Sequence, residues 1–338
     1  MKKILSLIIT LLVMVNLQSM ASDVDVLATM NSRSSAPDRV WVGTFQLVWN
    51  DLIDKIVHTV IRFREGTPPV AKELNERTFS AEDLSGKSYY KTTERITKNT
   101  KQNIEKAIAK KFNEKSDLLD KLDLTPAKNR FLIYAMLKKD FEFTNEYDKL
   151  GSAPFGQNMT AEYFGIDNYT DKSVKEGVKV LFYNGTNDYA VMLTTKDNDE
   201  VYLYKNGANK PFNYLYKDML QKTKMYKGNN RMASVDEFKA PNIKFFAEKS
   251  FDEVTNKRIM GTHYVIQQAL ETVKFNMDNK GVQLKSEAAM TVMLTSAGPM
   301  QEIPRRFYFD DTFVLFLQEK GKSNPYFALR VCDITKFQ

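Results

Sequence analysis

The sequence predicts an α+β fold, in which helices dominate the first part of the chain and strands the second. Apolar residues recur at helical spacing early in the chain, whereas compact apolar runs separated by turn residues follow from about Arg130. This order favours an α+β domain over a doubly wound sheet. The chain has 338 residues, of which 43% are hydrophobic, so it can bury a sizeable core. Because no linker or internal repeat divides residues 22–338, we expect one domain.

Residues 1–21 have the pattern of a secretory signal peptide. Lys2 and Lys3 precede an apolar run from residue 4 to 15, and residues 19–21 offer small side chains where a signal peptidase reads. The run is about a dozen residues, shorter than the roughly 20 that a transmembrane helix needs. We therefore expect cleavage after about Ala21, a secreted or periplasmic mature chain, and no membrane span after removal of the signal. An uncleaved membrane anchor is the alternative.

Composition excludes several other classes of protein. The formal net charge of +7 is modest and spread along the chain. Such an excess can favour anionic surfaces, but an exported protein does not meet nucleic acid, so we expect no nucleic-acid partner. The single cysteine, Cys332, excludes an intramolecular disulfide framework. We expect a monomer that is stabilised by packing.

Helical patterns occur in three segments, at 41–60, 101–115 and 215–224. In the second segment Ile104 and Ile108 belong to one apolar face. Lysines occupy much of the rest, and a solvated helix face is the first interpretation of them. A binding patch for an anionic polysaccharide such as heparin is the second interpretation. These lysines are Lys101, Lys106, Lys110, Lys111 and Lys115.

Strand patterns dominate from residue 131 onward. The compact apolar run 131–137 is consistent with a strand buried on both faces. Asn184-Gly185 between two apolar runs predicts a hairpin. The remaining expected strands, including both arms of this hairpin, are 178–183, 189–193, 200–204, 265–277, 307–317 and 326–331.

Enzyme signatures are scarce. His58 and His263 are the only histidines, and nothing in the sequence links either one to a nucleophile. HExxH, CxxC, P-loop and GxSxG motifs are absent, and residues 197–200 lack the spacing of a calcium loop. We assign no catalytic residue, metal ligand or cofactor, and expect that the protein is not an enzyme. Two hypotheses about function are given at the end of this subsection, and a third is that the protein is an unrelated exported enzyme or surface protein.

A long connection separates two apolar strands near the C-terminal end. Residues 286–292 are small and compatible with a strand, and residues 295–303 carry Gly298 and Pro299. Connections of about 20 residues in compact domains are usually functional or disordered. An exposed segment of this kind is open to proteases.

With this connection the chain resembles a serpin over roughly residues 95–338. Residues 275–281 resemble the strand before the family's hinge, and Ser286-Glu287-Ala288-Ala289 resembles the hinge itself. Residues 307–316 and 326–331 resemble the strands after the reactive loop. Residues 238–244 and 251–254 are similar to a strand and short helix upstream, and residues 104–124 with 131–141 to the helix over a central strand.

The chain departs from the family pattern at four places. Residues 22–95 are shorter than the family's N-terminal helical region. Residues 282–285 separate Gly281 from the hinge, where serpins have almost none. Phe141 replaces the family's usual Trp, and Glu271 replaces a His on the strand that opens during loop insertion. Three of these changes fall in the parts of a serpin that take part in loop insertion. They therefore affect the expectation of inhibition more than the expectation of the fold.

The resemblance implies a serpin-like fold, with helices on a large mixed or antiparallel sheet and an exposed loop over 282–304. It implies a secreted serine-protease inhibitor that acts as a suicide substrate, with hinge residues Gly281, Ser286, Glu287, Ala288 and Ala289. The scissile bond falls in Pro299-Met300-Gln301, with Met300 before the cut. That residue implies an elastase-, chymotrypsin- or subtilisin-like target. A noninhibitory serpin-fold binding protein is the alternative.

Overall fold

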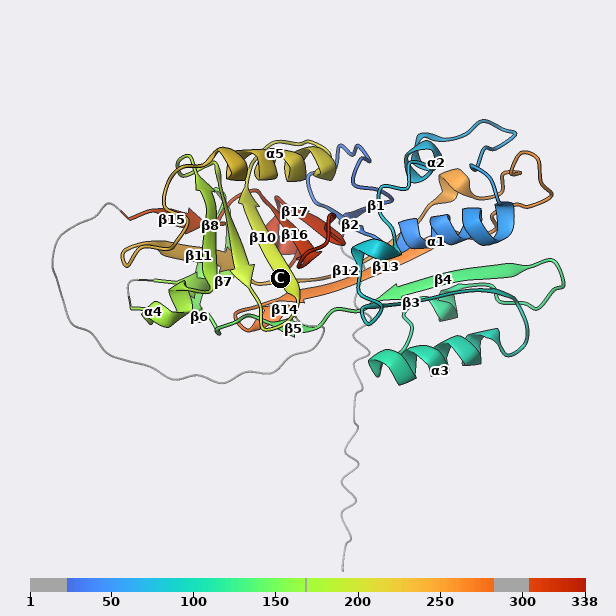
Figure 1. The fold of residues 1–338 in the computed structure, drawn as a ribbon, viewed down its shortest axis with the longest axis horizontal. Helices are drawn as coiled ribbons and strands as arrows, with labels where there is room; N and C mark the ends of the chain where they lie inside the picture. Colours follow the sequence, from blue (N-terminus) through green and yellow to red (C-terminus); the bar gives the residue numbers. More distant parts are fainter. Residues whose placement is uncertain (1–22, 168, 283–303) are drawn as a thin grey trace, which may run out of the picture.

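The largest sheet has seven strands (Figure 1). A computed structural model describes residues 23–167, 169–282 and 304–338. The strand order is β1-β2-β17-β16-β10-β9-β8, in which β1 and β2 are parallel and the other pairs antiparallel. Residues from both ends of the chain therefore meet in one sheet. The strands are β1 (Asp25–Leu27), β2 (Arg39–Val42), β8 (Val178–Tyr183), β9 (Tyr189–Thr194), β10 (Asp199–Lys205), β16 (Phe313–Glu319) and β17 (Phe327–Val331).

Three smaller sheets accompany it. One has the order β15-β11-β7-β6, a second has the order β12-β13-β14-β5, and β3 pairs with β4 alone. The strands of the first are β6 (Asp148–Phe155), β7 (Met159–Ile166), β11 (Glu237–Pro241) and β15 (Arg306–Tyr308). Those of the second are β5 (Phe141–Glu142), β12 (Ile243–Ser250), β13 (Leu270–Met277) and β14 (Gly281–Val282). The pair is β3 (Tyr89–Arg95) and β4 (Phe131–Leu137).

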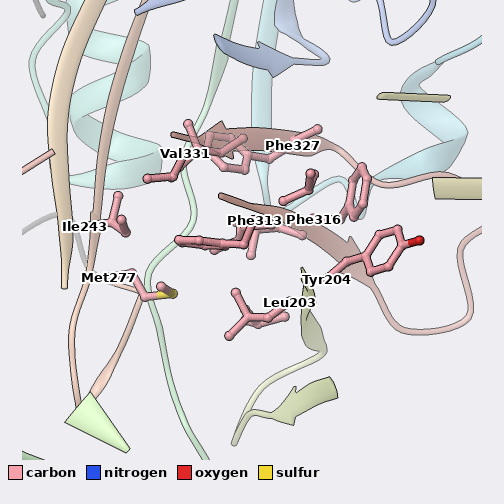
Figure 2. Packing of buried hydrophobic residues seen from close by; sticks show 14 of the residues in the cluster. Leu203, Tyr204, Ile243, Met277, Phe313, Phe316, Phe327 and Val331 are labelled. Carbon is pink, nitrogen blue, oxygen red and sulfur yellow. The ribbon is translucent and has the colours of Figure 1, made fainter. Parts of the chain in front are cut away.

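The main core lies between the seven-stranded sheet and its neighbours (Figure 2). Every residue of β16 is buried, as expected for a continuous apolar run covered on both faces. Phe316 meets the ring of Tyr216 from a covering helix at 5.2 Å, and Phe313 meets Phe309 at 5.5 Å. Met277 and Ile243 of the second small sheet join this core. The two sheets are thus held together by side chains that withdraw from water.

Helices cover the outside of these sheets. α1 (Thr44–Leu52) continues as a π-helix over Ile53–Val57, followed by α2 (Pro69–Leu74), α3 (Thr100–Phe112), α4 (Lys172–Lys175) and α5 (Phe212–Met225). Short 3-10 turns lie at Ala81–Asp83, Leu119–Lys121, Asp252–Val254 and Ile334–Lys336. α5 buries Phe212, Leu215, Tyr216 and Met219, the spacing of one helical face. None of the helices in the described ranges is long and apolar enough to cross a membrane.

The structure confirms the α+β class and most of the predicted elements. The Asn184-Gly185 hairpin forms as β8 and β9, the strand at 200–204 forms as β10, and the helices at 101–115 and 215–224 form as α3 and α5. α3 packs through Ile104 and Ile108 in one cluster with Leu132 and Tyr134 of β4. The expected helix over a strand is therefore present.

Four expected boundaries or burial patterns are wrong. The run 307–317 is two strands in different sheets, because Asp310 turns the chain toward Lys205 and Lys239 between them. The strand at 265–277 begins only at Leu270, and Trp41 of the expected 41–60 helix lies in β2. The run 131–137 is a strand, but most of its side chains are only half-buried, because it pairs with β3 alone and borders a groove.

Candidate functional site: a groove between two strands

A groove of about 1000 Å³ separates β4 from β13. β13 pairs along its whole length with β12, and on its other side only Met277 has a strand partner within the described ranges. β4 pairs only with β3 among the described residues. Side chains of α1, including Val48 and Leu52, line the groove between them. Figure 1 shows β4 and β13 next to each other, with α1 and α3 on opposite sides. Two strand edges thus face a space in which one more strand could pair.

The chain that leaves β13 turns back toward this groove. Gly281 pairs with Glu142 and Val282 pairs with both Phe141 and Met277, so β14 lies between β13 and β5. Val282 also lines the groove. Residue 282, the first of the four that separate Gly281 from the expected hinge, therefore belongs to a middle strand and not to a connecting loop.

Gly281 makes the close approach of β14 to β5 possible. A Cβ atom at this position would lie 2.3 Å from the carbonyl oxygen of Phe141 and 2.7 Å from the Cα of Glu142. Both contacts are with backbone, which cannot move aside as a flexible side chain can. The glycine that the sequence places before the hinge is thus required by packing against the neighbouring strand.

The other predicted loop residues lie outside the described residues. These are the hinge residues Ser286, Glu287, Ala288 and Ala289, and the scissile-bond residues Pro299, Met300 and Gln301. Their roles stay predictions.

Glu271 is a buried carboxyl group on the wall of the groove. Only 4% of the residue is exposed, and it lines the groove together with Thr44. Thr44 Oγ1 donates to Glu271 Oε1, and the backbone N–H of Phe45 also donates to this carboxyl group. Oε2 has no hydrogen-bond partner within residues 23–167, 169–282 and 304–338. Burial raises the pKa of Glu271 to about 8, against the smaller opposing effect of these two donors. The carboxyl group is therefore mostly protonated at neutral pH.

The sequence contains a signal for the burial of Glu271. Alternation along β13 places it on the same face as Val273, Phe275 and Met277, which are all buried. The resemblance identified the position only as a replaced His. The period of two would have identified it as a core carboxyl group.

A buried ion-pair network lies where β4 ends. Lys139 is 11% exposed, and its Nζ lies 2.8 Å from Asp199 Oδ1 and 2.6 Å from Glu319 Oε1. Burial acts to raise the pKa of Glu319, but hydrogen bonds from Lys139 and Ser88 outweigh it, so this pKa is lowered. The pKa of Asp199 is raised by burial despite the same lysine. The network ties the segment between β4 and β5 to β10 and β16 of the large sheet.

A second ion pair fixes the chain directly before β15. The carboxylate of Asp236 accepts from the backbone N–H of Arg305 at 2.9 Å, and its Oδ2 lies 2.6 Å from Arg305 Nη2. β15 then pairs in parallel with β11. The segment 283–303 is therefore flanked by β14 on one side and, after residues 304 and 305, by β15 on the other.

The lysine face of α3 is partly engaged within the protein. Lys101 pairs with Asp120, and Lys111 donates to the backbone carbonyls of Gly86 and Tyr89. Lys106, Lys110 and Lys115 are exposed. The described part of the chain contains no group of His, Cys, Asp and Glu able to hold a metal ion.

The comparisons with known proteins identify the fold. No family model matches the chain, and no curated protein matches it in sequence. Its structure is similar to the thermophilic serpin Tengpin in the native state, with a TM-score of 0.57 and 12% identity over 90% of this chain and 91% of that one. It is less similar to Serpin48, a highly specific serpin of the insect Tenebrio molitor (TM-score 0.44, 12% identity, 73% and 77% covered). A further similarity is to thyroxine-binding globulin in complex with thyroxine (TM-score 0.45, 12% identity, 69% and 64% covered). Of these three structures, Tengpin has a TM-score above 0.5, and this similarity shows that the chain has the serpin fold.

Proposed function

We propose that this protein is a secreted inhibitor of extracellular serine proteases, and that it acts as a suicide substrate through the segment 282–304. The observation that carries the proposal is the place of β14. The chain at Gly281–Val282 already lies between β13 and β5, at one end of the groove that separates β13 from β4. After cleavage, the residues that follow could continue this strand along the groove.

Insertion has a clear physical basis in this geometry. An inserted strand would give the facing edges of β4 and β13 a hydrogen-bonded neighbour each, which is the way a serpin loop enters its sheet. β13 has eight residues and β4 has seven. At about 3.3 Å per residue the eight residues of β13 span roughly 26 Å, so the groove can accept the whole hinge.

The hinge residues fit the demands of insertion. Side chains that pass between two separating strands must be small, as Ser286, Ala288 and Ala289 are. Alternation with a period of two directs Glu287 outward. Cleavage next to Met300 would release the hinge, and an apolar residue before the cut suits an elastase-, chymotrypsin- or subtilisin-like protease. The signal sequence at 1–21 would deliver the protein to the compartment in which it meets such proteases.

The second candidate function is a noninhibitory binding protein. It is favoured by the size and lining of the same groove. A volume of about 1000 Å³ is at the upper end of the range for pockets that hold small ligands, and many of the lining side chains are apolar. In this case the groove would hold a ligand in place of an inserted strand. For either function, the exposed lysines of α3 are the proposed contact for an anionic polysaccharide.

Incubation with proteases separates the two functions. The mature chain is mixed with elastase, chymotrypsin or subtilisin and run on denaturing gels, and the thermal stability of the cleaved product is measured. We expect a complex that survives SDS and a cleaved product that is markedly more stable than the native chain. Cleavage near Met300 without a complex and without a rise in thermal stability would refute the trapping mechanism.

Two hinge variants make the test specific. Ala288→Arg places a long charged side chain on the inserting face, so it should be cleaved without forming a complex. Glu287→Arg changes the outward position and should still trap the protease. Equal complex formation by both variants would exclude insertion of this segment into the groove.

A further inference from the structure

Two buried arginines lie directly opposite each other on β2 and β17. Arg39 and Arg330 are register partners, and they are only 1% and 4% exposed. Val42 and Phe327 are register partners at the opposite ends of the same two strands, and both line the groove between β4 and β13. Like charges directly opposite each other on neighbouring strands are destabilising, and burial increases the effect. Such a pair therefore calls for a compensating negative charge.

The described part of the chain supplies only neutral acceptors to these arginines. Arg39 donates to the backbone oxygens of Ala36 and Lys210 and to the side-chain oxygen of Asn209. Arg330 donates to the backbone oxygens of Pro37 and Gly207. The Nε atoms of both arginines are buried and have no hydrogen-bond partner among the residues that the structure describes. Burial, together with the charge of Arg330, lowers the pKa of Arg39 to about 10, although Asp25 acts in the opposite direction.

The nearby carboxylates are engaged elsewhere. Asp25 stands beside Arg39 in the β1–β2 register, but it accepts from Ser34 and pairs with Lys249 at 3.1 Å. Asp38 accepts from the backbone N–H groups of residues 332 and 333 and pairs with Lys336 at 3.1 Å. Neither forms an ion pair with Arg39 or Arg330 among the described residues.

A pocket of about 620 Å³ opens beside Arg39. None of its lining residues is acidic, and three are cationic: Arg33, Arg39 and Lys210. The lining also offers the hydroxyl groups of Ser34 and Ser35 and the ring of Tyr214, which is 56% exposed. The pocket thus combines positive charge and hydrogen-bond donors, which suit an anionic group, with one aromatic surface.

We propose that this arginine pocket, formed by Arg33, Ser34, Ser35, Arg39, Lys210 and Tyr214, binds a small organic anion that carries a carboxylate, sulfate or phosphate group. The anionic group supplies a negative charge to the buried guanidinium group of Arg39, and the attraction is strong because this group is withdrawn from water. Arg33 and Lys210 hold its oxygen atoms at the more exposed end of the pocket. An inorganic anion would fill only a small part of the volume, so Tyr214 is assigned to the organic part. The proposal is independent of protease inhibition and of the groove.

Thermal unfolding of the mature chain at constant ionic strength tests this site. Benzoate, phenyl sulfate, phenyl phosphate and inorganic phosphate are each titrated against a chloride baseline. The Arg Nε–Hε resonances are followed by NMR in the same titrations. We expect a saturable rise in Tm with at least one aryl anion and a shift of the Arg39 resonance, because its Nε is without a partner in the free protein. A response to inorganic phosphate alone would overturn the assignment of an organic ligand.

Charge-matched variants locate the site. The double variant Arg33→Gln/Lys210→Gln removes two exposed cations from the pocket and should weaken binding at least tenfold. The control Lys217→Gln/Lys224→Gln removes two exposed cations from α5 outside the pocket and should bind as the unaltered chain does. The proposal is overturned if no anion gives a saturable change, or if both double variants respond equally.

Discussion

Replacing Glu271 by Gln should remove a pH dependence of stability that arises from one buried carboxyl group. Glutamine has nearly the same shape as protonated glutamic acid and can keep accepting from Thr44 and from the backbone of Phe45. It cannot ionise. The substitution therefore changes the charge of the groove wall and leaves its packing in place.

The size of the effect follows from the pKa of Glu271, which burial raises from 4.5 to about 8. The native state holds one more proton than the unfolded state between these values, so the free energy of unfolding falls as pH rises through this window. Each pKa unit corresponds to about 1.4 kcal/mol, which gives a loss of roughly 5 kcal/mol once Glu271 is fully ionised. Below about pH 4.5 the contribution disappears, because the group is protonated in both states.

Denaturant unfolding at several pH values between 5 and 9 measures this contribution. We expect the two chains to differ little at pH 5, and Glu271→Gln to be more stable by several kcal/mol at pH 9, on the scale of the linkage above. Glu253→Gln, an exposed position, serves as the control for loss of a carboxylate. Parallel stability curves for the unaltered chain and Glu271→Gln across this range would refute the burial of an ionisable group at this site.

Three further predictions concern β14, the ion-pair network at Lys139 and the chain before β15. Gly281→Ala should reduce hydrogen-exchange protection of the β14–β5 pair, because the added Cβ would lie 2.3 Å from the carbonyl oxygen of Phe141. The control Gly86→Ala should leave this protection unchanged, because a Cβ at Gly86 meets no atom within 4 Å. Lys139→Met should lower the free energy of unfolding by about 3–5 kcal/mol, since it leaves two carboxylates of a buried network without their cation. Lys196→Met, in an exposed ion pair, should lower the free energy of unfolding far less, and equal losses would contradict the network. Arg305→Leu should expose the β15 end of the loop to limited proteolysis, and unchanged cleavage would contradict its role in fixing that end.

Local patterns predicted the elements whose contacts lie close in the sequence. Asn184-Gly185 specified a two-strand turn, and the apolar stripe of 215–224 specified a helix, because both depend on spacing within a few residues. Local apolar patterns gave wrong strand boundaries where the chain passes from one sheet to another. The run 307–317 looks continuous, but the chain crosses from one sheet to another at Asp310. A one-dimensional apolar run does not record which sheet a residue joins.

The groove shows the same limit at the candidate site. The sequence predicted a hinge region and singled out Gly281 and the unusual Glu271, but it predicted residues 131–137 as a strand buried on both faces. Its exposure arises because no strand of the described part of the chain lies between β4 and β13, which is a property of the assembled sheet. The sequence did not predict the arginine pocket for a related reason, since its lining residues come from 33–39 and 209–214, which meet only in the folded chain.

The sequence by itself determined the α+β class, the candidate loop and a resemblance to serpins, because these depend on composition, local period and the order of segments. Tertiary structure alone decided that a groove separates β4 from β13, that β14 already enters between β13 and β5, and that two arginines face each other in the interior. These features depend on which strand edges meet, and the partners are brought together from distant parts of the chain. The free energy of such pairings comes from burial and hydrogen bonding across the whole sheet, which no short window of sequence contains.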